Sequence, residues 1–188
     1  YAQTVALGSL VEEARSNNPE IKANRAGSDA LSMKPPQEGA LPNPLIGIGM
    51  RNASFSDIKD GNDPMSNYHA FIEQDIPFPG KLSLREDIAE NEARSGRWMT
   101  DAVERKVIAE LKRAYFDWYF ILKSIEVTEQ NKALIKQFIE IAEVKYEVGS
   151  GYQQDVLRAQ VELSGFIERL ELLSAKKEII EARIRKIL

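Results

Sequence analysis

The chain has 188 residues and a formal net charge of −4, with 25 basic and 29 acidic side chains interspersed along it. Because a nucleic-acid surface requires a basic patch, this balance argues against nucleic acid as a partner. The chain contains no cysteine, which excludes a disulfide framework and a thiolate metal site. No run of about 18 apolar residues occurs, so the sequence predicts no transmembrane helix.

Residues 1–40 are expected to form short helices. Ser9 and Glu12 have the spacing of a capping box, in which two side chains bond the free backbone N–H groups at the start of a helix. The same spacing recurs at Ser83 and Glu86, near the expected start of a much longer helix. Both pairs therefore predict helix starts.

A second short helix is expected from Pro19 to Met33. Asn18 provides its N-cap, and Pro19 suits its first turn because the fixed φ of proline is already helical. Pro35 and Pro36 are expected to end this helix, because proline lacks a backbone donor and restricts the residue before it.

A period of two begins after the proline-rich segment 41–44 and indicates a strand over residues 45–55. A turn-rich stretch from 56 to 67 separates it from a second candidate strand over residues 68–76. About eleven residues is the length of one tilted strand across a bilayer. The alternative is a soluble β-hairpin lying on a helix. Two strands alone are only marginally stable, so both interpretations require a partner.

Residues 81–188 are predicted to form two long antiparallel helices joined by a tight turn. The stretch 81–147 contains no proline, and Gly96 is its only glycine. At about 1.5 Å per residue, one helix over this stretch extends roughly 100 Å. The sequence Val-Gly-Ser-Gly at 148–151 is expected to form the turn, since glycine readily adopts the conformation that closes a helix.

Apolar residues on both long helices recur in steps of three and four, the spacing of a coiled-coil seam. On the first helix they are Leu111, Tyr115, Trp118, Leu122, Ile125, Leu134, Phe138 and Ala142. On the second they are Leu163, Phe166, Leu170, Leu173, Ile180 and Ile184. Further apolar residues widen each stripe beyond one seam, which predicts more than one neighbour for each helix. We expect the additional neighbours to come from other copies of the chain.

Four stretches resemble, in order and in spacing, the TolC family of outer membrane efflux proteins, the trimeric ducts of Gram-negative tripartite pumps. The resemblance covers essentially the whole chain. The four stretches are LVEEARSNNP at 10–19, GALPNP at 39–44, QDIPFPGK at 74–81, and the turn YEVGSG at 146–151 with QDVLRAQ at 154–160.

The resemblance implies a passive conduit for small molecules or ions in the outer membrane of a Gram-negative bacterium, with its helical part in the periplasm. The implied partners are a periplasmic membrane fusion adaptor, outer membrane lipid and, indirectly, an inner-membrane pump. The full-length protein is expected to be a homotrimer. On this interpretation, residues 1–40 are N-terminal helices, 41–80 a two-stranded segment of an outer-membrane barrel, and 81–188 a hairpin of a coiled-coil α-barrel with its tip at 148–152.

The chain departs from the family in two respects. Family members are internally duplicated, and this chain resembles the first repeat only. We therefore expect a fragment of a longer protein rather than a half-length member that assembles with more copies. In addition, Pro35-Pro36 interrupts a region that tends to stay helical for longer in the family.

The resemblance assigns the adaptor-docking surface to the helical tip. Its expected members are Val148, Gly149, Ser150, Gly151 and Asp155. The alternative for the glycines is that they only serve the turn, and the two roles are compatible. Asp155 is expected in the first turn of the returning helix, where the helix dipole favours a carboxylate. A charged ring at the duct entrance is the alternative role for Asp155.

The two strands carry the second candidate site. If they span a membrane, one face points to lipid and the other to the lumen. The expected lipid-facing residues are Ile46, Ile48, Met50 and Ile72, and the expected lumen-facing residues are Arg51, Glu73 and Asp75.

The sequence offers little for catalysis. His69, Glu73 and Asp75 are close in sequence, but their spacing matches no known metal-ligand motif, and an exposed histidine is the simpler interpretation. There is no serine elbow, phosphate loop or H-E-x-x-H helix. We therefore predict no metal, no cofactor and no enzymatic activity. The predicted function is a component of an efflux duct, and the alternative is a soluble helical-hairpin scaffold that mediates protein–protein interaction.

Overall fold

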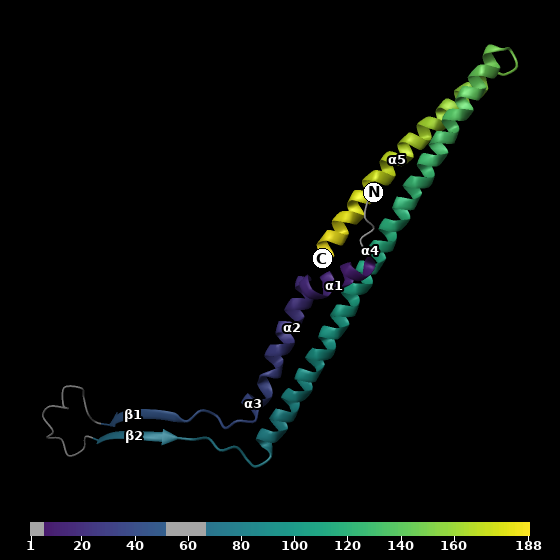
Figure 1. The fold of residues 1–188 in the computed structure, drawn as a ribbon. Coiled ribbons are helices and arrows are strands. Elements are labelled where there is room, and N and C mark those ends of the chain that lie inside the picture. Colours follow the sequence, from purple (N-terminus) through teal and green to yellow (C-terminus); the bar gives the residue numbers. More distant parts are fainter. Residues whose placement is uncertain (1–5, 52–66) are drawn as a thin grey trace. The chain divides into compact units, whose positions relative to one another are not determined.

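The computed structural model describes residues 6–51 and 67–188, and these residues are mostly helical (Figure 1). The expected fold class, long helices with a short two-stranded antiparallel sheet, is confirmed. In chain order the elements are α1 (Leu7–Asn17), α2 (Pro19–Ser32), α3 (Lys34–Glu38), β1 (Leu45–Arg51), β2 (Asn67–Glu73), α4 (Lys81–Glu147) and α5 (Gln153–Ile187). Within the described ranges, no helix combines the length and the apolar character required to cross a membrane.

The chain divides into two compact units. One contains residues 1–23 and 100–188, and the other contains residues 24–99. The helices α2 and α4 each contribute to both units. The first unit holds the helical hairpin, and the second holds α3, the strand pair and the beginning of α4.

The main hydrophobic core lies in the first unit, where α1 and the start of α2 pack on α4 and α5. Ile21 and Leu111 are its largest fully buried side chains. Their burial contributes about 1.5–3 kcal/mol each relative to exposure. The buried members of this core are Ala14, Ile21, Val103, Val107, Leu111, Ala114 and Ile187.

Asn18 connects the start of α2 to the last turn of α5. Its Oδ1 accepts hydrogen bonds from the backbone N–H groups of Glu20 and Ile21, at 2.9 and 3.1 Å. Its Nδ2 donates to the carbonyl oxygen of Ile187 at 2.7 Å, and the residue is buried. The predicted N-cap is therefore present, and the same side chain also satisfies a helix-terminal carbonyl that α5 leaves free.

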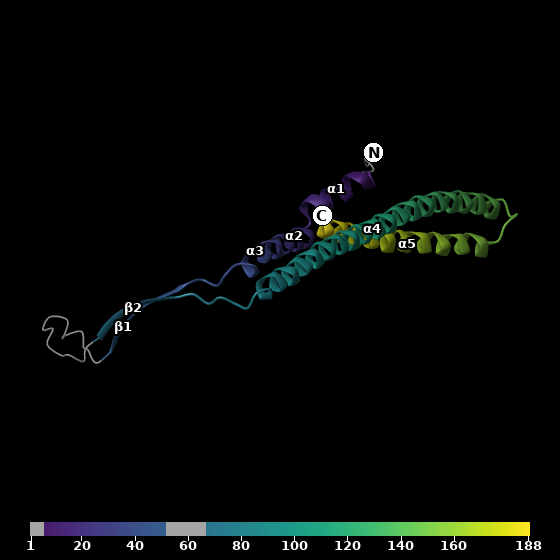
Figure 2. The same ribbon diagram turned by 90° about the horizontal axis from the view of Figure 1, so that it is seen from below.

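The helix α5 runs antiparallel to the second half of α4, and the two lie side by side in both views (Figures 1 and 2). Trp118 Nε1 donates to Glu181 Oε1 at 3.1 Å, and an ion pair joins Arg183 to Glu110 at 3.5 Å. These contacts belong to a hairpin whose facing side chains recur in alternating steps of three and four. The less exposed α5 positions at this spacing are Val156, Ala159, Leu163, Phe166, Leu170, Leu173, Lys177, Ile180, Ile184 and Ile187.

The corresponding seam on α4 differs in part from the expected one. Leu134 and Phe138 are more than half exposed, so their assignment to the seam is wrong. The neighbouring Ile135 and Ile139 are less exposed and occupy these levels instead. The less exposed α4 positions at a continuous heptad spacing are Leu111, Ala114, Trp118, Ile121, Ile125, Thr128, Lys132, Ile135, Ile139 and Ala142.

Both capping-box predictions are wrong. Ser9 and Ser83 lie inside their helices, which begin two residues earlier, at Leu7 and Lys81. Each serine hydroxyl donates to a carbonyl three residues before it, that of Ala6 at 2.7 Å and that of Gly80 at 2.9 Å. A serine bonded to a preceding carbonyl does not cap the free N–H groups, so the capping-box spacing is coincidental here.

The proline pair does not end helical structure as expected. Helix α2 stops at Ser32, and after a turn at Met33 a short helix α3 begins at Lys34 with Pro35 in its first turn. Proline is compatible with the first turn of a helix, because the N–H groups there have no intrahelical partner.

The strands pair in an antiparallel register in which Ile46 faces Ile72 and Arg51 faces Asn67. The expected first strand extends to residue 55, but residues 52–55 and the expected turn up to residue 66 lie outside the described residues. The second strand ends at Glu73 and not at residue 76. After β2, Gln74 Nε2 donates to the carbonyl oxygen of Pro42 at 2.7 Å, so a side-chain bond replaces the ladder there.

Replacing Asn18 with alanine removes the cap of α2 and leaves the Ile187 carbonyl without its donor. We expect the free energy of unfolding to fall by about 2 kcal/mol, since a cap and a buried hydrogen bond each contribute ~1 kcal/mol. Asn18→Ser retains a capping oxygen and loses the donor, so its loss is expected to be about half as large. Urea unfolding monitored by circular dichroism measures both, and equal losses would contradict two separable roles.

Candidate functional site

The turn between α4 and α5 is closed by the pair of backbone hydrogen bonds typical of a Schellman motif. The N–H of Gly149 donates to the Tyr146 carbonyl at 3.0 Å, and the N–H of Ser150 donates to the Lys145 carbonyl at 2.8 Å. Gly149 has a φ of +71°, as expected for the residue that closes the helix. A residue with a Cβ loses about 1–2 kcal/mol in this left-handed conformation, which explains glycine here.

Gly151 serves the turn differently from what we expected. It does not have a positive φ, so backbone freedom is not the reason for glycine at this position. A Cβ on Gly151 would lie 3.0 Å from the Cβ of Lys145 and 3.2 Å from its carbonyl carbon. The residue must therefore be small because the chain passes close to the last turn of α4.

Apolar side chains surround this turn and are open to solvent. Val148 is 71% exposed and Tyr152, the residue before α5, is 79% exposed. The sequence interpretation included Val148 and missed Tyr152, although an aromatic residue next to a glycine turn is a usable signal. Ser150 Oγ donates to the Lys145 carbonyl at 3.2 Å, so this side chain belongs to the turn.

Asp155 lies in the first turn of α5 and is exposed, where the sequence placed it. Its backbone N–H donates to the Tyr152 carbonyl at 3.0 Å. Tyr152 provides no side-chain cap for α5. The carboxylate of Asp155 is the acidic group in the first turn of this helix, near the free backbone N–H groups. The tip therefore combines a hydrogen-bonded backbone turn, exposed apolar side chains and one carboxylate.

The strand register separates the side chains of β1 and β2 onto two faces, since directly opposite residues share a face. The four residues predicted to face lipid, Ile46, Ile48, Met50 and Ile72, lie together on one face with Tyr68 and Ala70. Ile48 is 88% exposed. Arg51 and Glu73 lie on the opposite face at opposite ends of the sheet, while Asp75 lies beyond the end of β2.

Two aromatic rings cover two glycines on the second face. A Cβ on Gly47 would collide with the ring of Phe71, and one on Gly49 would lie 2.5 Å from His69 Nε2. The two rings also stack on each other, with centroids 6.2 Å apart. Glycine opposite an aromatic residue lets the ring lie flat on the sheet.

This arrangement accounts for His69 without a metal ion, because its ring contacts a glycine and a phenyl ring. Across the described ranges, no three or more His, Cys, Asp or Glu side chains are grouped so that they can hold a metal ion.

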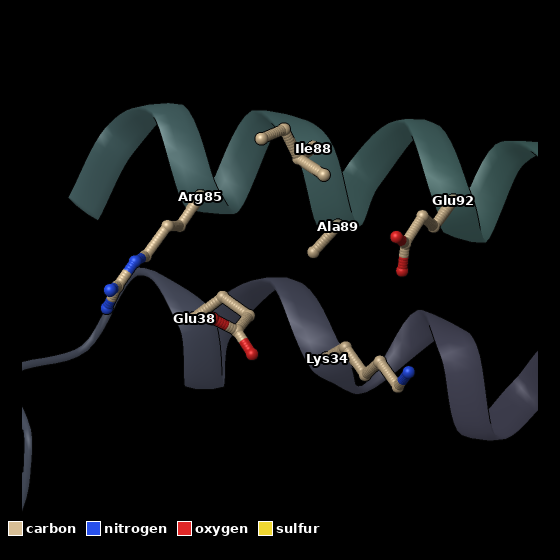
Figure 3. A pocket seen from close by; sticks show the side chains of 6 residues that line it. All are labelled: Lys34, Glu38, Arg85, Ile88, Ala89 and Glu92. Atoms are coloured by element: carbon tan, nitrogen blue, oxygen red, sulfur yellow. The ribbon is translucent and has the colours of Figure 1, made fainter. Parts of the chain in front are cut away.

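The second unit contains a surface groove of about 240 Å³ between α3 and the beginning of α4 (Figure 3). Ala89 is buried, and the other lining residues are exposed. The groove is surrounded by two cationic and two carboxylate side chains, those of Lys34, Arg85, Glu38 and Glu92. These charges are balanced and solvated, so the groove provides neither a charged ligand site nor a catalytic arrangement.

The outer side of α4 carries an apolar stripe that we had not separated from the seam. Its members recur every seven residues and lie outside the α4–α5 seam. Their exposed fractions range from 51% for Leu134 to 71% for Val148. We call this set the outer stripe: Phe120, Val127, Leu134 and Ile141 on α4, and Val148 directly after its last residue. A strict period of seven, counted separately from the seam, was the signal in the sequence.

A family model described as outer membrane efflux protein matches residues 10–188. No curated protein sequence matches the chain. Solved structures share its fold, and three of them serve as examples. The outer membrane protein VceC from Vibrio cholerae has a TM-score of 0.76 and 14% identity, over 96% of this chain and 46% of that chain.

The Campylobacter jejuni CmeC outer membrane channel has a TM-score of 0.73 and 15% identity, over 96% of this chain and 40% of that chain. A membrane protein from Pseudomonas aeruginosa has a TM-score of 0.74 and 14% identity, over 97% of this chain and 44% of that chain. The chain thus spans less than half the length of each of these structures. The family match confirms the resemblance found in the sequence, and the family is one of efflux proteins and not of enzymes.

Substitutions at Gly149 test whether the turn depends on the left-handed conformation. We expect Gly149→Ala to lower the free energy of unfolding of the hairpin by about 1 kcal/mol, and Gly149→Asn by less, because asparagine adopts this conformation more readily. Urea unfolding monitored by circular dichroism compares the two variants. Equal free energies of unfolding for the alanine and asparagine variants would show that the left-handed φ of Gly149 does not determine the stability of the turn.

Proposed function

Because the chain belongs to the outer membrane efflux protein family, we propose that it forms part of the wall of an efflux duct. In this proposal the duct is a passive conduit for small molecules or ions, and several copies of the chain or of its full-length protein surround it. The three segments 1–40, 41–80 and 81–188 then correspond to short helices, the membrane-embedded strands and the periplasmic hairpin.

The outer stripe is the observation that carries this proposal. The helix α4 uses one heptad seam to pack on α5, yet it exposes a second apolar line with a strict period of seven. An apolar stripe on the outside of a hairpin requires a further helix to cover it. The helix α5 also exposes apolar residues away from the seam, including Val161, Leu172 and Ile179. A helix pair with apolar residues on two outer sides suits a lateral array, as in the wall of a duct.

We propose copies of the same protein as the occupants of these faces, in a homotrimer when the protein is full length. The strands require neighbours for the same reason, since two strands have unpaired edges and are marginally stable alone. In the membrane, the face with Ile46, Ile48, Met50 and Ile72 would contact outer membrane lipid, and Arg51, Glu73 and Asp75 would border the lumen.

The helical tip is the proposed docking surface for a periplasmic membrane fusion adaptor, which would connect the duct to an inner-membrane pump. Val148 and Tyr152 support this role, because exposed apolar and aromatic side chains on a hydrogen-bonded turn suit a protein contact. Gly149, Ser150 and Gly151 would shape this surface through the backbone, and Asp155 would add a charge at its edge. Opening would follow from a shift of the tip helices when the adaptor binds.

The double substitution Leu134→Asp with Ile141→Asp places two charges in the outer stripe. We expect the wild-type chain in detergent to form oligomers and this variant to be monomeric, because an interface that buries two unpaired carboxylates loses several kcal/mol. Light scattering coupled to gel filtration measures the molar mass.

The matched control is Gln130→Asp with Gln137→Asp, which has the same charge and the same spacing at exposed polar positions of α4 that flank the outer stripe and belong to neither stripe. This control is expected to keep the wild-type mass. A wild-type chain that is monomeric, with a helical content equal to that of the variant, would favour the soluble scaffold instead.

Since the chain has no native cysteine, single cysteines can test the docking surface directly. We expect Val148→Cys and Tyr152→Cys to cross-link to a purified periplasmic adaptor of the host cell with a short bifunctional reagent. Ala182→Cys, exposed on α5 far from the tip, serves as the control. Equal cross-linking at Ala182 and at the tip would contradict docking through the turn.

A further inference from the structure

The α4 side of the α4–α5 seam contains one polar layer. Thr128 and Lys132 occupy successive seam positions on α4 and interrupt the apolar series between Ile125 and Ile135. Thr128 is 6% exposed. Only 25% of the Lys132 side chain is exposed, and its Nζ lies 3.1 Å from Glu129 Oε2 on the same helix. A lysine or other polar residue in a coiled-coil seam reduces stability locally.

Two side-chain hydrogen bonds to helix carbonyls also occur at and just before this layer. Ser124 Oγ donates to the Phe120 carbonyl at 2.8 Å, and Thr128 Oγ1 donates to the Ser124 carbonyl at 2.7 Å. Such side-chain bonds to carbonyls four residues earlier compete with the backbone bonds and often bend helices. In Figure 2, α4 is curved over its second half.

The surface of the hairpin is grooved at the same level. An open groove of about 350 Å³ lies beside the layer, between α4 and α5. The groove is lined by the apolar Phe120, Val127 and Phe166, by Thr128, and by the cationic Lys123 and Arg169. Lys123 is held by Glu126 at 2.7 Å, whose hydrogen bond and charge raise the pKa of the lysine.

Burial differs between the two sides of the layer. On the side of α1, α4 has fully or almost fully buried seam residues, such as Leu111, Ala114 and Ile121. On the side of the tip, no α4 residue beyond Thr128 is buried, and Val156 is the only buried residue of α5 before Leu170. Segments with few buried apolar contacts open locally at a lower free energy than the rest of a protein.

We propose that the layer formed by Thr128 and Lys132 is a hinge. At this hinge the outer part of the hairpin, residues 133–165, opens as one unit while the part nearer α1 remains packed. The hinge itself follows from the packing of this chain. Its use in duct opening rests on the proposed function, in which it would let the tip move on contact with the adaptor without disrupting the core around Leu111.

Hydrogen exchange measured by mass spectrometry on the full purified chain in detergent tests the hinge. In the wild-type chain, we expect the amides of 133–147 and 153–165 to exchange together, at least about tenfold faster than those of 107–121. Lys132→Leu fills the seam with an apolar side chain, and should slow exchange in both outer segments about tenfold with no change in 107–121.

The matched control is Lys136→Leu, which makes the same replacement one turn later at an exposed position. It is expected to leave the outer segments unchanged. Equal slowing by Lys132→Leu and Lys136→Leu would overturn the proposal. So would wild-type protection that falls gradually towards the tip with no step at Lys132, since this indicates fraying rather than a hinge.

The exchange profile of the wild-type chain tests the hinge even if a variant fails to fold. Thr128→Val provides a second variant in which an apolar side chain replaces a polar one in the same layer. Because the adaptor takes no part in this experiment, its result is independent of the cross-linking at Val148 and Tyr152. Exchange without a step, together with tip cross-linking, would reject the hinge and keep the duct. A clear step without cross-linking would keep the hinge and reject the docking role.

Discussion

Apolar surface on more than one side of a long helix is the constraint on which the rest of this structure depends. Helix α4 buries one stripe against α5 and leaves the outer stripe from Phe120 to Val148 open to solvent. The hydrophobic effect favours the burial of apolar surface on any side of a helix. A helical hairpin with this pattern is therefore stabilised by association. The core around Leu111 stabilises the hairpin, and the stripe favours neighbours.

Much of the fold follows from local rules that the sequence shows openly. The absence of proline and the turn glycines predict α4, the turn and α5, and α4 has the expected bounds of Lys81 and Glu147. Asn18-Pro19 predicts the start of α2 because the cap and the first-turn proline act within a few residues. Features of this kind need no knowledge of tertiary contacts.

The remaining differences come from choices that only tertiary structure decides. Leu134 and Ile135 are both apolar and adjacent, so composition alone does not tell which of them faces α5. The polar Thr128 and Lys132 lie in the seam, against the usual pattern, and therefore hide its true register. The second bond of Asn18, to the Ile187 carbonyl, joins residues far apart in the chain. The sequence did not identify Tyr152 as part of the tip, because the exposure of a residue beside a turn depends on the direction of the turn in the folded chain.

The period of the outer stripe has a geometric consequence. A straight α-helix has 3.6 residues per turn, so residues spaced by seven drift by about 20° per heptad around its axis. From Phe120 to Val148 there are four such intervals, and the line would rotate by roughly 80° on a straight cylinder. Neighbouring helices can follow the whole line only by coiling around one another with a left-handed twist. In a tube built from such helices, each helix would then wind around the central channel. A change in this winding would widen or narrow the opening.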